Sequence, residues 1–249
     1  MESIDLGFFQ IPVYSLLLAI ALLYGSFALY FFAYRENAPT DKMSGLLICS
    51  IVSSLVFARF AHVFLYDWNY FKTNLWEIPM VWEGGLASHG AAIGFIFGVV
   101  FHTRFWGNIW YWWIFDRMAI AIPFGAAIIR LGNFANSELY GKISNCAFCI
   151  VFENAGSLPR YPVQLMEAAA YLLLGLILYT LYFKKWKITH LGIYTGLMLT
   201  SINILRIALE FFKASDSVFW GLNTSQLLSI PFLFLGLLLM FAGYGKRLN

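Results

Sequence analysis

Residues 123–141 read Pro-Phe-Gly-Ala-Ala-Ile-Ile-Arg-Leu-Gly-Asn-Phe-Ala-Asn-Ser-Glu-Leu-Tyr-Gly, and this stretch decides how the chain folds. It continues an apolar run that begins near residue 114 and has the length of a membrane span. The run ends in Arg130, and Gly132 follows as a residue that can stop a helix. Polar donors and acceptors come next. The stretch therefore predicts a membrane helix that carries a polar site at its end.

The whole chain has the composition of a protein that lies in lipid. Of its 249 residues, 61% are hydrophobic and 12% are charged, and the mean hydropathy is +0.72. A soluble domain carries about 25% charged residues, so this chain has too little charge to cover a water-facing surface. The net charge is only +3 and the basic residues are dispersed, so no nucleic-acid partner is expected.

Hydropathy predicts an all-α membrane protein with about seven transmembrane helices, in one domain over residues 1–249. The expected spans are 11–34, 43–66, 86–103, 114–132, 162–183, 190–212 and 224–243. Glu2 and Asp5 precede the first span where a signal peptide would be basic, so we expect this span to remain uncleaved. The longest connection, about 133–161, is expected to form a periplasmic loop region, and loops of that length are usually functional or disordered.

Basic residues predict the orientation, because cytoplasmic loops carry more of them. With the N-terminus outside, the inner loops hold eight: Arg35, Lys42, Arg104, Lys184, Lys185, Lys187, Lys246 and Arg247. The outer loops hold four: Lys72, Lys142, Arg160 and Lys213. The other four lie within or at the ends of spans: Arg59, Arg117, Arg130 and Arg206. We therefore expect the N-terminus outside and the C-terminus in the cytoplasm.

This topology brings polar residues from six spans to one depth near the outer face, although hydropathy alone defines the spans. The residues are Tyr14, Arg59, His89, Arg130, Asn133, Glu138, Gln164, Glu167, Arg206 and Glu210. Of the polar residues considered, only Asp116 and Arg117 clearly lie at the inner end. A charge in hydrocarbon costs about 2.5–3.5 kcal/mol or more. The set is therefore expected to line a wet chamber that opens to the outer leaflet.

Each of these residues also has a simpler structural explanation. Arg206 and Glu210 are four residues apart on one helix and could neutralise each other. Arg130 could be an arginine that extends to the interface, while His89 and Tyr14 could be packing and interface residues. A transporter or channel would also place charges in membrane helices. It would place them near the midplane, however, and the sequence contains no pair of broken helices.

The three cysteines do not form a disulfide framework. Cys49 lies in an apolar run and is expected to be a packing residue. Cys146 and Cys149 form a Cys-x-x-Cys pair in the polar loop, where a disulfide or half of a metal site is possible.

Residues 130–141 resemble the signature of the bacterial prolipoprotein diacylglyceryl transferase family. Four further segments resemble motifs of that family in the same order, at residues 83–90, 159–167, 206–213 and 225–231. Tyr14 falls where the family has a functional tyrosine. The chain differs from the family in carrying Ala91, Lys142 and Tyr161 where glycine, arginine and histidine are common. The similarity covers nearly the whole chain.

The resemblance implies an enzyme of the bacterial cytoplasmic (inner) membrane whose active site faces outward. Its reaction moves the diacylglyceryl group of phosphatidylglycerol to the lipobox cysteine thiol of a preprolipoprotein. A thioether forms and glycerol phosphate leaves, with no metal or organic cofactor expected. A transferase of the same fold with another lipid donor is the related alternative.

Roles for individual residues follow from the motifs. The expected catalytic residues are His89 as the base and two arginines as the phosphate clamp, Arg130 and Arg206. The thiol could be activated by His89 or by the field of an arginine, and the sequence leaves this open. The expected substrate-binding residues are Tyr14, Gly90, Asn133, Glu138, Gly141, Gln164, Glu167 and Glu210.

Overall fold

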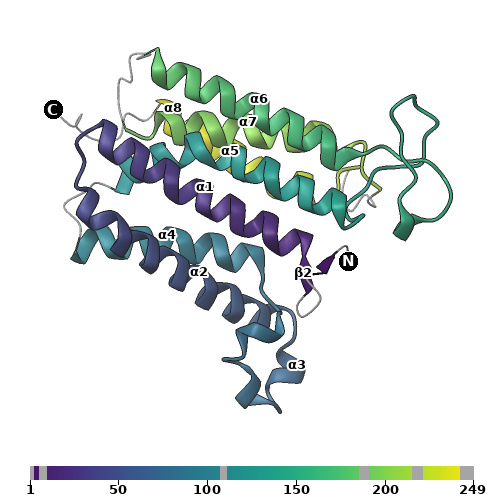
Figure 1. Ribbon diagram of the computed structural model, residues 1–249, viewed down its shortest axis with the longest axis horizontal. Helices are drawn as coiled ribbons and strands as arrows, with labels where there is room; N and C mark the ends of the chain where they lie inside the picture. The colour runs from purple at the N-terminus through teal and green to yellow at the C-terminus, as the bar shows by residue number, and fades with distance from the viewer. Residues whose placement is uncertain (1–2, 6–9, 107–110, 185–190, 215–220, 242–249) are drawn as a thin grey trace. The chain divides into compact units, whose positions relative to one another are not determined.

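The computed structural model describes residues 3–5, 10–106, 111–184, 191–214 and 221–241, and within these ranges it is almost entirely helical (Figure 1). A short hairpin comes first, in which β1 (Ser3–Asp5) pairs antiparallel with β2 (Gln10–Pro12). The long helices are α1 (Val13–Arg35), α2 (Met43–Leu65), α4 (Ser88–Phe105), α5 (Tyr111–Ala135), α6 (Val163–Phe183), α7 (Ile193–Glu210) and α8 (Thr224–Phe241). The connections contain the short helices η1 (Thr40–Lys42), α3 (Trp68–Phe71), η2 (Leu75–Glu77), η3 (Val81–Glu83) and η4 (Glu153–Ala155).

Each expected span corresponds to one long helix, and the helical membrane-protein class is confirmed. Five helices are long and apolar enough to cross a membrane: α1, α2 with η1 (Thr40–Leu65), α5, α6 and α8. The other two, α4 and α7, have 18 residues each, and seven spans remain a prediction. Some of the predicted positions lie outside the described residues. They are the first residue of the expected span 190–212, the last two residues of the expected span 224–243, and the basic residues Lys185, Lys187, Lys246 and Arg247.

The long helices present apolar side chains outward. Leu23 and Phe27 of α1 are each 70% exposed. Only 22% of the most apolar 18-residue stretch of this helix is buried within the protein. Large exposed apolar surfaces are rare on soluble monomers. Lipid is therefore the natural solvent for these faces.

The chain folds as two compact units: unit 1 consists of Met1–Ala28 and Phe115–Asn249, and unit 2 of Leu29–Ile114. In unit 2, α2 and α4 lie side by side (Figure 1). The face of α4 toward α2 contains Gly90, Gly94 and Gly98, which are spaced four residues apart. A Cβ atom at Gly90 or Gly94 would collide with a backbone carbonyl of α2. Small residues thus let the two backbones approach closely.

In unit 1, α7 packs on α8 through Gly196, where a Cβ atom would lie 2.7 Å from the Gly236 carbonyl oxygen. Asp116 of α5 is fully buried and fixes the start of α7. Its carboxylate accepts hydrogen bonds from the backbone N–H groups of Gly192 (2.7 Å) and Thr195 (2.9 Å). The first N–H groups of a helix have no partner within the helix. Asp116 therefore caps α7 from a neighbouring helix.

Candidate active site

The signature segment runs from the end of α5 into an ordered turn of unit 1. The helix continues three residues beyond Gly132, so the expectation that this glycine stops it is wrong. Gly132 instead makes room for a ring, because a Cβ atom there would lie 3.0 Å from Cδ2 of Tyr14. The turn that ends the helix is closed by the N–H of Glu138, which donates to the Asn133 carbonyl at 2.9 Å. Tyr14 and the signature segment therefore lie together.

Two acidic and two basic side chains form a buried cluster next to this segment, which we call the four-charge cluster: Arg130, Glu167, Glu210 and Lys213. Glu167 is fully buried, with Arg130 Nε 2.9 Å from its Oε2 atom and Lys213 Nζ 2.9 Å from its Oε1 atom. Lys213 Nζ also lies 3.0 Å from Glu210 Oε2. Buried charges need such partners because an unpaired one is costly. The positive and negative charges of the cluster cancel.

Glu210 is the last residue of α7, and its partners come from the residues that follow this helix. Besides Lys213, it accepts a hydrogen bond from Asn223 Nδ2 at 3.1 Å. Asn223 in turn exchanges hydrogen bonds with Gln226 at the start of α8. Of the carboxylates in the described part of the chain, none pairs with Arg206. The expected Arg206–Glu210 pair is therefore wrong, since Lys213 and Asn223 occupy the Glu210 carboxylate.

Arg206 nevertheless belongs to the same region. The Tyr171 hydroxyl is subject to the charges of Arg130, Glu167 and Arg206 together. Tyr171 is buried in a small core with residues of α5 and α6, against which Leu205 of α7 packs. Arg206 follows Leu205 on α7 and is half-buried. Its positive charge therefore adds to a cluster whose other charges cancel, and the cluster together with Arg206 carries one net positive charge, which favours an anion.

Amide side chains hold the remaining signature residues in place. Arg130 Nη1 donates to Asn133 Oδ1 at 3.1 Å. Glu138 is exposed, but Asn136 Nδ2 donates to its Oε1 atom at 3.1 Å and Gln164 Nε2 donates to its backbone carbonyl. The Gln164 side chain is fully buried. Glu138 is thus an exposed side chain that is held at its backbone carbonyl and at one carboxylate oxygen.

Gly141 lies where three chain segments meet. Its N–H donates to the Tyr161 carbonyl at 2.9 Å, and the next N–H, of Lys142, donates to the Phe212 carbonyl at 2.8 Å. A bridge pairs Gly141 with Lys213. A Cβ atom at Gly141 would lie 2.6 Å from Tyr161 Cβ and 2.7 Å from the Phe212 oxygen. Only glycine fits, and it ties the signature segment to the four-charge cluster.

The loop after Gly141 is held by backbone pairing and by one disulfide. The N–H of Arg160 donates to the Ile150 carbonyl at 2.9 Å, and its guanidinium lies 4.9 Å from the centroid of the Tyr140 ring. Cys146 and Cys149 form a disulfide. The disulfide alternative is thus confirmed and the metal half-site is wrong, because bonded sulfurs cannot act as thiolate ligands. No cluster of three or more metal-binding side chains occurs among the described residues.

In unit 2, Arg59 holds a connection of the chain in place, whereas the sequence predicted that it lines a wet chamber. It is 5% exposed, and its Nε and Nη1 atoms donate to the carbonyls of Ile78 (2.8 Å) and Gly84 (2.7 Å). Nη2 donates to the Glu77 carbonyl, and the guanidinium lies 4.9 Å from the Phe71 ring centroid. These contacts clamp the connection between α2 and α4. The expectation that Arg59 lines the chamber is wrong, because the backbone of the connection takes up its donors.

That connection leads directly into the segment with His89. His89 is the second residue of α4, and it is exposed. The next residue, Gly90, is buried against Phe57 and Ala61 of α2. A contact of Gly90 with substrate therefore stays a prediction, while its packing role is evident.

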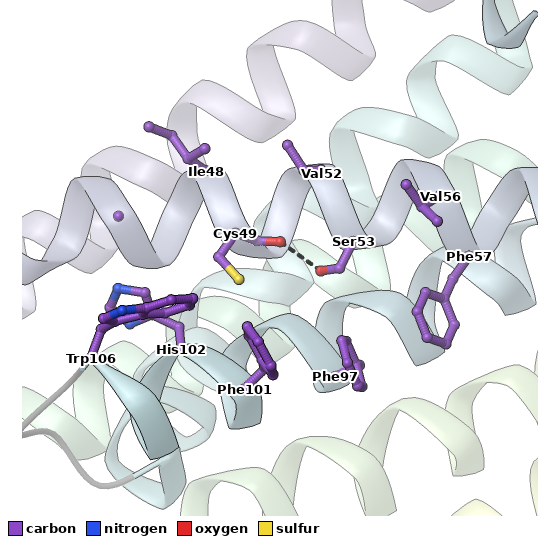
Figure 2. Close-up of a pocket in the computed structure, with 11 residues that line it drawn as sticks. Ile48, Cys49, Val52, Ser53, Val56, Phe57, Phe97, Phe101, His102 and Trp106 are labelled. Atoms are coloured by element: carbon purple, nitrogen blue, oxygen red, sulfur yellow. Dashed lines mark hydrogen bonds between the residues drawn. The ribbon is translucent and has the colours of Figure 1, made fainter. Parts of the chain in front are cut away.

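A groove of about 560 Å³ also lies between α2 and α4 (Figure 2). Its walls include Val52, Phe97 and Phe101, with His102 and Trp106 at one end. Cys49 lies in the wall as a free thiol, in keeping with the packing role expected for it. None of the lining residues is Lys, Arg, Asp or Glu. The groove suits hydrocarbon and has no cation to bind a phosphate.

Unit 1 contains nine of the eleven residues expected at the site: Tyr14, Arg130, Asn133, Glu138, Gly141, Gln164, Glu167, Arg206 and Glu210. His89 and Gly90 belong to unit 2. Sequence reasoning did not assign site roles to Lys213, Asn136 or Asn223. The ion pair of Lys213 with Glu210 could have been predicted from the sequence. Lys213 follows Glu210 by three residues, a spacing at which side chains on a helical turn meet.

Comparison with known proteins identifies the family. The family model for prolipoprotein diacylglyceryl transferase matches residues 2–242. The phosphatidylglycerol–prolipoprotein diacylglyceryl transferase of Tolumonas auensis is 35% identical over 240 residues, covering 95% of this chain and 93% of the relative. Those of Chloroherpeton thalassium and Bacteroides fragilis are 34% and 33% identical, covering 96% and 99% of this chain and 91% and 94% of the relatives. The chain belongs to the prolipoprotein diacylglyceryl transferase family.

Proposed function

We propose that this chain transfers the diacylglyceryl group of phosphatidylglycerol to the lipobox cysteine of preprolipoproteins, the first step of lipoprotein maturation. Family membership over nearly the whole chain supports this activity. The observation in unit 1 that carries it is the charge arrangement: the four-charge cluster is neutral, and the adjacent Arg206 has no carboxylate partner among the described residues. Such a site suits one anionic group, and the phosphate of phosphatidylglycerol carries one negative charge.

The reaction requires cleavage of a carbon–oxygen bond. The thiolate sulfur of the lipobox cysteine attacks the glycerol carbon that bears the phosphate ester. A sulfur–carbon bond forms as the carbon–oxygen bond breaks, and glycerol phosphate leaves with the bonding electron pair. The thiol proton goes to a base, because the thiolate is the nucleophile. The leaving phosphate needs donors placed where its charge develops.

The phosphate clamp consists of Arg130 and Arg206. Arg presents a planar fork of donors that matches phosphate oxygens. Glu167 holds Arg130 through its Nε atom at 2.9 Å, and Asn133 holds its Nη1 atom at 3.1 Å, so this guanidinium is fixed before the substrate arrives. Fixed donors stabilise a transition state without reorganisation.

The other residues take supporting roles. His89 is the base that receives the thiol proton, for which its exposed position on α4 is suitable. Tyr14, which packs on Gly132, binds the lipid head group together with Glu138. Gln164 positions Glu138 through its backbone carbonyl. Gly90 and Gly141 allow chains to approach closely, and Glu210 orients neighbouring cations.

The membrane arrangement proposed for this activity has seven spans, with α4 and α7 joining the five longer apolar helices. The N-terminus lies outside and the C-terminus in the cytoplasm of the bacterial inner membrane, in accordance with the distribution of basic residues. The active site then faces the outer leaflet. Lipobox cysteines of exported precursors reach the site from that side.

An in vitro assay tests the clamp. Purified protein receives phosphatidylglycerol with a radiolabelled diacylglyceryl group and a lipobox peptide, and thioether product is counted. We expect Arg130→Ala and Arg206→Ala to lower kcat/KM by 100-fold or more, on the order of what is lost when one transition-state donor is removed. Arg104→Ala removes an exposed arginine of α4 and serves as the matched control. Full transfer by either clamp variant would contradict the proposal.

A second experiment tests the base. His89→Asn keeps a hydrogen-bonding side chain but cannot accept the thiol proton. Histidine and thiol groups both titrate within about pH 6–9, so the variant should lose rate and also change the shape of the pH–rate profile. A normal rate across this range would exclude His89 as the base and leave the arginine field as the activator.

A further inference from the structure

Lys213 occupies an unusual position at the end of α7. Its ammonium group lies 2.9 Å from Glu167 on α6 and 3.0 Å from Glu210 on α7. The Lys213 side chain is only 12% exposed, and the carboxylate side chains are 0% and 4% exposed. One cation thus serves two buried carboxylates from two helices.

The backbone holds Lys213 at this position. It pairs with Gly141 in an isolated bridge, and the adjacent Phe212 carbonyl accepts the N–H of Lys142 at 2.8 Å. Lysine side chains are flexible and lose rotamer entropy when they are held. The backbone of Lys213 is anchored on the signature segment, so fewer positions are open to its side chain. These backbone contacts place the ammonium group within reach of both carboxylates.

Without Lys213, the nearest cation in sequence to Glu210 would be Arg206. The two residues are four apart on α7, a spacing at which oppositely charged side chains pair. A buried carboxylate that loses its partner is strongly destabilising. Glu210 would then draw Arg206 toward itself, and Arg206 would no longer be available to an anionic ligand.

We propose that Lys213 is a positioning residue for the transfer reaction: by neutralising Glu210, it keeps Arg206 free to bind the phosphate of the anionic lipid donor. This inference rests on the proposed function. It differs from a direct role, because Lys213 touches carboxylates of the protein and its charge acts on the substrate through Arg206. The identity of the residue matters less than its charge and reach.

Four variants test this allocation of charge: Lys213→Met, Lys213→Arg, Lys213→Met combined with Glu210→Gln, and Lys142→Met. The last removes the same charge from an exposed neighbour and is the matched control. KM and kcat for phosphatidylglycerol are measured with saturating lipobox peptide. Lys213→Met should raise KM about tenfold or more, as expected when a charged hydrogen bond to the substrate is lost, with a smaller change in kcat.

The other variants make the test specific. Lys213→Arg keeps the charge and should stay within about threefold of the unmodified KM, as should Lys142→Met. The double variant removes the carboxylate that would capture Arg206, so it should recover part of the lost affinity and have a lower KM than Lys213→Met. A purely structural role predicts the opposite order, because the double variant lacks one more native interaction.

Three results would overturn the proposal: an unchanged KM in Lys213→Met, a double variant no better than Lys213→Met, or a raised KM in Lys142→Met of similar size. If Lys213→Met does not fold, as judged by its circular dichroism melt, the double variant is compared with Glu210→Gln alone. The proposal then requires equal KM values, since an uncharged side chain at position 210 cannot capture Arg206. Absence of transfer by the unmodified protein would instead refute the proposed function itself.

Discussion

Glu167→Gln is the substitution that most directly tests the buried charges of unit 1. Glu167 is fully buried and pairs with two cations, at 2.9 Å from Arg130 Nε and 2.9 Å from Lys213 Nζ. Glutamine has nearly the same shape but no charge. Both cations then lose a carboxylate, and the cluster gains one net positive charge.

The expected loss follows from the remaining partners. Removing one member of a buried ion pair costs about 3–5 kcal/mol. Arg130 keeps its hydrogen bond to Asn133, and Lys213 keeps its ion pair with Glu210, so the lower end of that range applies. A loss of about 3 kcal/mol changes the folding equilibrium about 150-fold, since about 1.4 kcal/mol corresponds to a factor of ten.

The assay is reversible unfolding in mixed micelles of a mild and a denaturing detergent, followed by circular dichroism. Glu153→Gln is the control, because Glu153 lies exposed in η4 and the chemical change is the same. We expect the control to stay within about 0.5 kcal/mol of the unmodified protein, as surface substitutions do. A Glu167→Gln variant as stable as this control would refute the reasoning, because loss of the shared carboxylate would then leave no uncompensated buried positive charge.

Three further outcomes are expected. Gly141→Ala should cost about 1–3 kcal/mol of unfolding free energy, since a Cβ atom there lies within 2.7 Å of neighbouring atoms; chemical unfolding measures it, and a neutral result would contradict the close approach. Arg59→Lys should speed tryptic cleavage after the exposed Lys72, because an ammonium cannot span the carbonyls that the guanidinium holds; unchanged cleavage would argue against the clamp. Tyr70 donates to the Glu77 carboxylate at 2.7 Å, and this hydrogen bond raises the pKa of Tyr70 above its usual value. The contact is therefore complete below pH 10 and is lost as the pH rises through the raised pKa, and Glu77→Gln should lower that pKa in a carbon-13 tyrosine NMR titration.

The separate behaviour of Arg59 and Arg206 illustrates the reach of sequence reasoning. Both arginines lie near the end of an apolar run, and hydropathy assigns them the same depth. The structure gives Arg59 a set of backbone carbonyls as partners, whereas none of the carboxylates among the described residues pairs with Arg206. The difference depends on the connection 66–87 folding back over Arg59, which no local pattern around either arginine encodes.

The sequence by itself determined that the protein lies in lipid, where its long helices run, and which family it resembles. A backbone in lipid must satisfy its own hydrogen bonds, and apolar runs of about 20 residues do so as helices. The motifs around residues 130–141 and 206–213 are contiguous in the chain. Only the tertiary structure decided the partners of the charges: Glu210 pairs with Lys213 and Asn223 instead of Arg206, and Asp116 caps α7 by accepting the N–H of Gly192, 76 residues later in the chain. The physical reason is that hydropathy is a sum over neighbours in sequence. A charge in lipid, in contrast, pairs with an opposite charge or a dipole that the packing of the helices places within about 3 Å. That partner can come from any helix.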